Sequence, residues 1–169
     1  MDKAQVHIYT DGAARGNPGP SGYGIVMEWV GKPYKKEFSE GFAHSTNNRM
    51  ELLAVIEALK KLKKPGIYVT VFTDSKYVVD TVEKKWYVKW EKTNFKDKKN
   101  PDLWKLFLIE YRKHHVSFKW IKGHNNHPQN ERCDALAVAA SKEKKLKIDV
   151  GFVNSTENNN TNSLDFPKA

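Results

Sequence analysis

The sequence is poor in the features that mark secreted, disulfide-linked and membrane-spanning proteins. It has one cysteine, Cys133, in 169 residues, so no disulfide can form within the chain. A chain without disulfides suits a reducing compartment. No run approaches the roughly 18 apolar residues that a membrane span needs, and residues 1–10 lack the apolar stretch of a signal peptide. We therefore expect a cytoplasmic protein with no membrane partner.

Acidic residues are scarce relative to basic ones. The chain has 29 Lys and Arg against 20 Asp and Glu, which gives a formal charge of +9. The excess is uneven, because residues 84–99 hold seven lysines and two acidic residues, a local charge of +5. Such an excess is typical of proteins that bind nucleic acid or an anionic surface. The alternative is an ordinary soluble protein with many solvated lysines.

The hydrophobic pattern predicts one domain of mixed structure. Hydrophobic residues make up 39% of the chain, which is enough for a single core. Alternating or strongly apolar runs predict strands at residues 5–10, 23–30, 34–42, 67–73 and 116–121. Helical spacing and capping residues predict helices at residues 52–62, 75–82, from 100 onward, and 131–145. This order indicates an α/β fold in which helices flank a mixed sheet.

Two details of this pattern are specific enough to test. Pro65-Gly66 is expected to end the first helix, because proline cannot continue it. The apolar run at residues 67–73 is expected to be buried on both faces.

The composition changes near residue 149. The stretch NSTENNNTNS is rich in asparagine and has no periodicity. We expect a catalytic domain over residues 1–148 and a polar tail over residues 149–169, which is ordered only if something docks it.

Four acidic residues stand in separate strings, and their predicted positions converge. Asp11 and Asp74 are expected at strand ends, where sites form in open α/β sheets. Glu51 extends the helix stripe that faces the sheet, and Asp134 lies early in the last helix. Carboxylate oxygens suit Mg²⁺ or Mn²⁺, and two ions about 3.5–4 Å apart need several carboxylates. Within a basic chain, this pattern points to a metal-dependent nuclease.

Each carboxylate also has a structural interpretation. Asn48 and Glu51 fit a helix capping box, Asp74 could cap the next helix, and Asp11-Gly12 could form a turn. Taken singly, such residues are more often structural than catalytic. The metal-site interpretation depends on four strings together, which are TDGAARGNPGPSGYG, STNNRMEL, FTDSKYV and WIKGHNNHPQNERCD.

In this order and at this spacing, the four strings resemble the motifs of type 1 ribonuclease H. The resemblance covers about residues 5–142. It implies the ribonuclease H-like fold, a five-stranded mixed sheet flanked by helices. It also implies endonucleolytic hydrolysis of the RNA strand of RNA/DNA hybrids, leaving 3′-hydroxyl and 5′-phosphate ends. The metal ligands that it implies are Asp11, Glu51, Asp74 and Asp134.

The implied chemistry uses two Mg²⁺ ions, for which Mn²⁺ can substitute. One ion would activate the attacking water, and the other would stabilise the leaving 3′-oxygen. No side chain has to act as a covalent nucleophile, and we expect the enzyme to work as a monomer.

A histidine in the loop GHNNHP is expected to assist. His124 matches the family's catalytic histidine and can carry a proton near neutral pH. His127 is its competitor, with loop packing before Pro128 as its alternative role. A zinc site made of His124, His127 and Cys133 is a rival, but it has no common zinc spacing and lacks a fourth ligand. Cys133 is expected to be an ordinary buried or half-buried residue.

Substrate contacts are expected around the first helix. Gly12 permits close backbone approach to a nucleic-acid strand. Asn17, Asn47 and Asn48 are amides suited to base edges and sugars in a minor groove. Turn and cap roles are the alternative for these asparagines, and the resemblance favours substrate contact.

A further set of contacts follows from the resemblance alone. Thr46, Arg49 and Asn100 match positions that help to hold a phosphate of the DNA strand. Asn100 is also a candidate helix cap, and both roles can coexist. Lys76 stands where many members of the family carry glutamine, so its minor-groove contact is in doubt.

Residues 84–99 are similar to the family's basic protrusion. Aromatic rings can lie against sugars or bases while lysines meet phosphates. Helix packing is the alternative for the tryptophans, which are four residues apart. The residues expected to contact substrate here are Lys84, Lys85, Trp86, Lys89 and Trp90.

Two other functions fit parts of the pattern. A hybrid-binding protein without catalysis would need no carboxylate cluster, and all four carboxylates are present. A resolvase-like or integrase-like nuclease could share the fold, but the strings NNRMEL and GHNNHPQNE favour ribonuclease H.

Overall fold

The computed structural model describes residues 3–123 and 127–156. Five strands form one sheet in the order β3-β2-β1-β4-β5. The first three are antiparallel neighbours, and β4 and β5 continue the sheet in parallel with β1. The strands are β1 (Gln5–Ala14), β2 (Gly19–Trp29), β3 (Lys35–Ser45), β4 (Tyr68–Thr73) and β5 (His115–Trp120). The predicted five-stranded mixed sheet is confirmed.

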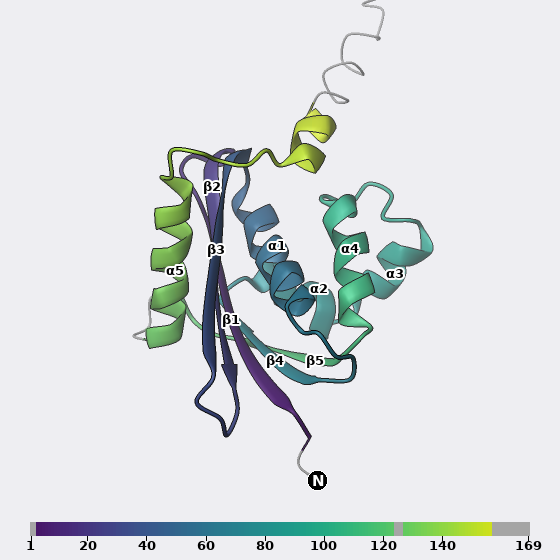
Figure 1. Cartoon of the computed structure of the whole chain (residues 1–169). Helices are drawn as coiled ribbons and strands as arrows, with labels where there is room; N and C mark the ends of the chain where they lie inside the picture. The colour runs from purple at the N-terminus through teal and green to yellow at the C-terminus, as the bar shows by residue number, and fades with distance from the viewer. Residues whose placement is uncertain (1–2, 124–126, 157–169) are drawn as a thin grey trace, which may run out of the picture.

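Helices cover the two faces of the sheet (Figure 1). Helix α5 packs over β1, β2 and β3 on one face, while α1 packs on β1 and β2 from the other and carries α4 on its outer side. The helices are α1 (Asn47–Lys60), α2 (Lys76–Glu83), α3 (Trp86–Lys92), α4 (Pro101–Tyr111) and α5 (Pro128–Ser141). Within the described residues, no helix is both long and apolar enough to cross a membrane.

Helix α1 lies at the centre of the core. Its residues Leu52, Val55, Ile56 and Leu59 are completely buried, as their spacing predicted. The helix ends at Lys60, with Lys61 as its C-cap, several residues before Pro65-Gly66. The predicted stop signal is therefore not what ends this helix, and Leu62 packs beside the core from the loop that follows.

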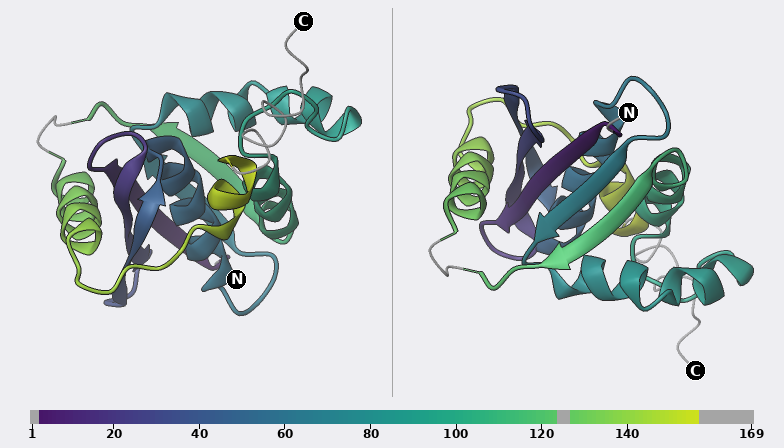
Figure 2. Two further views of the ribbon diagram at one scale, coloured as in Figure 1. Left: turned by 90° about the horizontal axis from the view of Figure 1, so that it is seen from above. Right: turned by 90° about the horizontal axis from the view of Figure 1, so that it is seen from below.

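Strand β4 is buried on one face only. Val69, Val71 and Thr73 are buried, whereas Tyr68, Thr70 and Phe72 alternate with them and are half-buried. The prediction of burial on both faces is wrong. The physical reason is that α5 packs over β1–β3 and leaves this part of the opposite face uncovered (Figure 2).

The backbone of α5 lies unusually close to β2. A Cβ added at Gly24 would overlap the carbonyl oxygen of Cys133, so glycine is what allows this approach. Gly24 is also the cross-strand partner of Asp11. The contact therefore fixes the distance between β1 and the helix that carries Asp134.

The chain remains ordered beyond the predicted end of the domain. Asp149 is 7% exposed, and residues 150–156 are helical. Figure 1 shows this segment in yellow-green above the N-terminal ends of α1 and α4. The first part of the predicted polar tail is thus packed on the domain, and residues 157–169 lie outside the described residues.

Replacing Gly24 with Ala is expected to destabilise the protein by about 1–3 kcal/mol, because the added methyl group must push α5 away from β2. Chemical denaturation of both proteins measures the difference. Gly31→Asn is the matched control: Gly31 has φ +77° and open space around it, and asparagine tolerates that conformation. Equal stability of Gly24→Ala and the unaltered protein would contradict the close-packing argument.

Candidate active site

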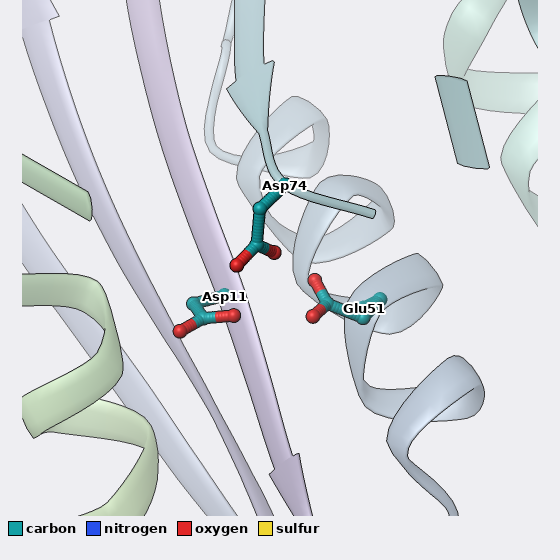
Figure 3. A group of neighbouring side chains, drawn as sticks. All are labelled: Asp11, Glu51 and Asp74. Atoms are coloured by element: carbon teal, nitrogen blue, oxygen red, sulfur yellow. The ribbon is translucent and has the colours of Figure 1, made fainter. Parts of the chain in front are cut away.

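Three carboxylates from three separate elements meet at one point. Asp11 of β1, Glu51 of α1 and Asp74, which follows β4, each place one oxygen within 4.8 Å of the others. Figure 3 shows the three side chains pointing toward one another. They line an open cavity of about 420 Å³, and Asp134 of α5 lines the same cavity without belonging to the tight group.

Strand pairing brings Asp11 and Asp74 together. The last paired residues of the parallel strands β1 and β4 are Tyr9 and Phe72. Asp11 and Asp74 each follow two residues later, so they lie at the same end of this strand pair. Asp11 was expected to end its strand, but β1 continues to Ala14 through pairing with β2. The alternative of an Asp11-Gly12 turn is wrong for the same reason. The Asp11 carboxylate accepts a hydrogen bond from its neighbour's backbone N–H at 3.0 Å.

Glu51 has no capping role. The N-cap of α1 is Thr46, whose hydroxyl accepts from the backbone N–H of Arg49, so the proposed capping box of Asn48 and Glu51 is not formed. Glu51 instead turns toward the sheet and is 3% exposed. Its Oε2 atom is buried without a hydrogen-bond partner.

Asp74 is likewise not a helix cap. Ser75 caps α2, and its side chain accepts from the backbone N–H of Val78. Trp120 of β5 donates from Nε1 to the backbone carbonyl of Asp74 at 3.1 Å. This contact, which the sequence did not suggest, fixes the backbone that carries Asp74.

The electrostatics of the cluster favour a bound cation. Burial, followed by repulsion from Asp74, raises the pKa of Asp11 from its ordinary value of 3.8 to about 7. Burial and the charge of Asp11 raise the pKa of Glu51 well above its usual range. Three crowded carboxylates, one with an unpaired buried oxygen, are an arrangement that a hard divalent ion stabilises. The donor set therefore fits Mg²⁺ or Mn²⁺.

Comparisons with known proteins agree with this geometry. Residues 3–142 match the family described as RNase H. The chain belongs to the ribonuclease H family.

Relatives in this family resemble the chain over most of its length. A Ribonuclease H of Desulforamulus reducens is 51% identical over 151 residues, covering 86% of this chain and 93% of its own. One from Nitratidesulfovibrio vulgaris is 49% identical, covering 90% and 99%. The chain is thus a ribonuclease H, a metal-dependent endoribonuclease that cleaves RNA in RNA/DNA hybrids.

Solved structures share the fold. LC9-RNase H1, a type 1 RNase H with the type 2 active-site motif, is 30% identical, with a TM-score of 0.74, and the match covers 83% of this chain and 74% of that one. LC11-RNase H1, solved in complex with an RNA/DNA hybrid, is 29% identical, with a TM-score of 0.59 and coverage of 80% and 95%.

Several residues that the ribonuclease H resemblance assigns to substrate do line the cavity. Asn47, Asn48 and Lys76 are among them, and the Lys76 ammonium lies over the Trp120 ring at 4.7 Å from its centroid. Gly12 lines it too. A Cβ there would press on the backbone of Glu51 at 2.7 Å, so this glycine also serves the packing of α1 on β1.

Two other predicted contacts have local structural roles. Thr46 caps α1, as described above. The side-chain oxygen of Asn17 accepts from the backbone N–H of Asn47 at 3.1 Å and so satisfies another free donor of the same helix end. The structural alternative is therefore realised for Asn17, and Thr46 has a capping role that the sequence analysis did not predict.

Arg49 and Asn100 have partners within the protein. Arg49 is 2% exposed and forms ion pairs with Asp102 and Asp149, each at 2.7 Å. Asn100 is the N-cap residue of α4, as predicted, but its side chain makes no capping hydrogen bond. Its side chain accepts from Arg49 and donates to the hydroxyl of Tyr77.

The basic protrusion of the enzyme includes a packed tryptophan and an exposed one. Trp90 packs edge-on against the fully buried Trp104, so helix packing is confirmed for it. Trp86 is 43% exposed and lies at 6.4 Å from Trp90, centroid to centroid. The lysines Lys84, Lys85 and Lys89 are exposed.

The histidines separate into two cases. His124 lies outside the described residues, so its predicted role stays a prediction. His127 is the N-cap of α5, and its Nδ1 accepts from the backbone N–H of Asn130. Cys133 is fully buried and donates from Sγ to the carbonyl of Tyr9, which confirms an ordinary buried cysteine.

Sequence reasoning missed the acidic partners of Arg49. Asp102 was visible only as a residue of a helix start, and Asp149 as the first residue of a polar tail. No local spacing rule connects residues 49 and 149, so no signal in the single sequence could have paired them.

Magnesium is expected to raise the melting temperature more at pH 8 than at pH 5.5. The pKa of Asp11 is above its unfolded value, so the folded protein keeps a proton that the unfolded chain loses between about pH 4 and 7. Metal-free stability therefore falls as the pH rises through this window. At pH 8 the ion relieves repulsion between unprotonated carboxylates, whereas at pH 5.5 it must displace a proton.

Thermal denaturation with Mg²⁺, or with NaCl at matched ionic strength, measures this effect. Asp11→Asn should reduce the pH dependence, and the part that remains is attributed to Glu51, whose pKa is also raised by burial. Equal magnesium shifts at both pH values would show that Asp11 does not share a site with the ion.

Proposed function

We propose that the enzyme hydrolyses the RNA strand of an RNA/DNA hybrid in the cavity formed by Asp11, Glu51, Asp74 and Asp134. The convergence of three carboxylates around an unpaired buried oxygen of Glu51 carries this assignment. These residues would hold two Mg²⁺ ions, or Mn²⁺ in their place. When bound, such ions activate water and stabilise charge on the leaving 3′-oxygen, giving 3′-hydroxyl and 5′-phosphate products.

The protein's own contribution is to position these groups. Asp11 is fixed by strand pairing and Glu51 by the rigid central helix, so neither has to reorganise when charge develops. Trp120 holds the backbone of Asp74. Asp134 lies on the closely packed α5 and lines the same cavity.

We assign the hybrid to the surface that surrounds this cavity. Gly12, Asn17, Asn47 and Asn48 would face its minor groove, and Lys76 adds a cation at the cavity edge. Thr46 and Asn100 would lie near a DNA-strand phosphate. The enzyme would act as a monomer in the cytoplasm, which stays a prediction of the sequence.

Cleavage of an end-labelled RNA/DNA hybrid, with and without Mg²⁺, tests the function. The unaltered protein should cut the RNA strand only with the ion, and should leave duplex DNA intact. Asp11→Asn should abolish cleavage and retain hybrid binding, because it removes one charged ligand and no basic residue. It should also keep or raise the metal-free melting temperature, since repulsion with Asp74 is relieved. Near-normal turnover of Asp11→Asn at saturating Mg²⁺ would remove Asp11 from the metal site.

The two loop histidines should give different phenotypes. His124→Ala is expected to slow turnover by about 10²–10⁴-fold without eliminating it, as loss of general acid–base help does. His127→Ala removes the N-cap of α5 and should cost about 0.5–2 kcal/mol of stability. Single-turnover and steady-state rates, measured well below the melting temperature, separate the two. A larger rate loss for His127→Ala would reverse the assignment.

Replacing Lys84, Lys85, Lys89 and Lys92 together with Ala should weaken hybrid binding and flatten its salt dependence. Each phosphate contact adds roughly 0.7–0.9 to the slope of log affinity against log salt, so we expect the slope to fall by about 1–3. Turnover at saturating substrate should change far less.

A matched control replaces four other lysines with Ala, at the C-terminal end of α1 and in the loop that follows it. These are Lys60, Lys61, Lys63 and Lys64. That variant should keep the salt slope of the unaltered protein. Equal slopes for all three proteins would withdraw the protrusion as a binding element.

A further inference from the structure

The segment that follows Asp149 is built into the domain beside the active site. The Asp149 carboxylate accepts from the hydroxyl of Ser45 at 2.6 Å and from two nitrogens of Arg49. The helical residues 150–156 then lie across the N-terminal ends of α1 and α4 (Figures 1 and 2). On this helix, the ring of Phe152 contacts that of His44 at 5.4 Å between centroids.

Arg49 is saturated by this arrangement. Its Nε and Nη2 atoms donate to Asp149 at 2.7 and 2.9 Å. Its Nη1 and Nη2 atoms donate to Asp102 at 2.9 and 2.7 Å, and Nη1 also donates to Asn100 at 3.2 Å. A guanidinium has five N–H donors, and all five are used. Arg49 therefore has no donor left for a phosphate.

A groove with both polar and apolar lining lies between these elements. It encloses about 620 Å³ and has three walls. The first comes from the turn at Asn17 and the start of α1, and the second from Lys98, Lys99 and the start of α4. The third is residues 150–156. Asn48 lines both this groove and the carboxylate cavity, so the two sites adjoin. A hybrid whose RNA strand lies in the cavity can therefore place its DNA strand in the groove.

The charge of the groove is opposite to that of the catalytic cavity. Among the described residues that line it, two are lysines and none is acidic. Asp149 and Asp102 are not among these lining residues, and the two carboxylates share the charge of Arg49. A groove with ammonium, amide and hydroxyl groups fits the phosphodiester backbone of a nucleic acid.

The short helix presents one face to the groove. Phe152, Ser155 and Thr156 line it, at the spacing of residues that share a helix face. The two hydroxyls now donate to backbone carbonyls within the same helix. Such hydroxyls can rotate to donate to an acceptor in the groove. Asn154 is exposed and is not among the residues that line the groove.

We propose that residues 150–156 form the third wall of a binding groove for a phosphodiester of the DNA strand. Ser155 and Thr156 contact that phosphate together with Lys98 and Lys99. Arg49 is a positioning residue that fastens this wall through Asp149, and it is not a phosphate ligand. The inference rests on the proposed placement of the hybrid across the carboxylate cavity.

Charge placed on the two faces of the helix tests the proposal in the full-length protein. Ser155→Glu and Thr156→Glu should each weaken hybrid binding, and Ser155→Lys and Thr156→Lys should each strengthen it. We expect about 3- to 10-fold in either direction for one exposed charge near a phosphate. Asn154→Glu and Asn154→Lys add the same charges on the same helix and should change affinity less than 2-fold, or about 0.4 kcal/mol. Fluorescence anisotropy of a labelled hybrid in EDTA measures binding without cleavage.

Hybrids with one neutral methylphosphonate identify the strand. At one position of the DNA strand, the methylphosphonate should weaken binding to the unaltered protein, and it should weaken binding to Ser155→Glu less. Methylphosphonates in the RNA strand should affect the two proteins equally. Equal effects at positions 154, 155 and 156 would overturn the proposal, as would tighter binding by the Glu variants. If these binding effects appear but the unaltered protein does not cleave the hybrid, the catalytic assignment fails and the groove stands.

Discussion

The parallel pairing of β1 with β4 is the constraint on which the site depends. These two strands are adjacent in the sheet but are separated in sequence by an antiparallel meander and a helix. Because the two strands are parallel, their paired segments end side by side, and Asp11 and Asp74 follow at that end of the sheet. Helix α1, which makes the connection, must then cross the sheet and brings Glu51 to the same edge. A disturbance of this pairing would separate the carboxylates even if each element kept its own structure.

The three carboxylates of the site repel one another, and the surrounding fold has to hold them together. Burial and like charge both oppose ionisation of Asp11 and Glu51, and the described protein atoms offer no partner to Glu51 Oε2. The surrounding contacts are correspondingly rigid. Gly24 admits the backbone of α5, Gly12 admits that of α1, and the indole of Trp120 holds Asp74. The divalent ion would neutralise the buried carboxylates, and the nucleic acid would neutralise the lysines of the surface.

The sequence predicted those features that have local or periodic causes. Alternation located the strands, the stripe of Leu52, Val55, Ile56 and Leu59 located the central helix, and the four strings located the carboxylates. It failed where tertiary packing decides. The extent of β1 depends on its partner β2, and the burial of β4 depends on where α5 packs. The roles of Arg49 and Asn100 depend on partners that are distant in sequence. The capping box of Asn48 and Glu51 failed because α1 begins two residues earlier, with Thr46 as its N-cap.

The ion pairs of Arg49 join parts of the chain that are synthesised far apart in time. A buried guanidinium is costly without its counter-ions, and one of them arrives 100 residues later, at Asp149. During synthesis, the sheet and all five labelled helices can emerge before that partner does. Asp149 can therefore pair with Arg49 only after the rest of the domain has been synthesised. A chain that ended just before Asp149 would keep every catalytic carboxylate and the Arg49–Asp102 pair, but it would leave two of the five donors of a buried guanidinium without their acceptor.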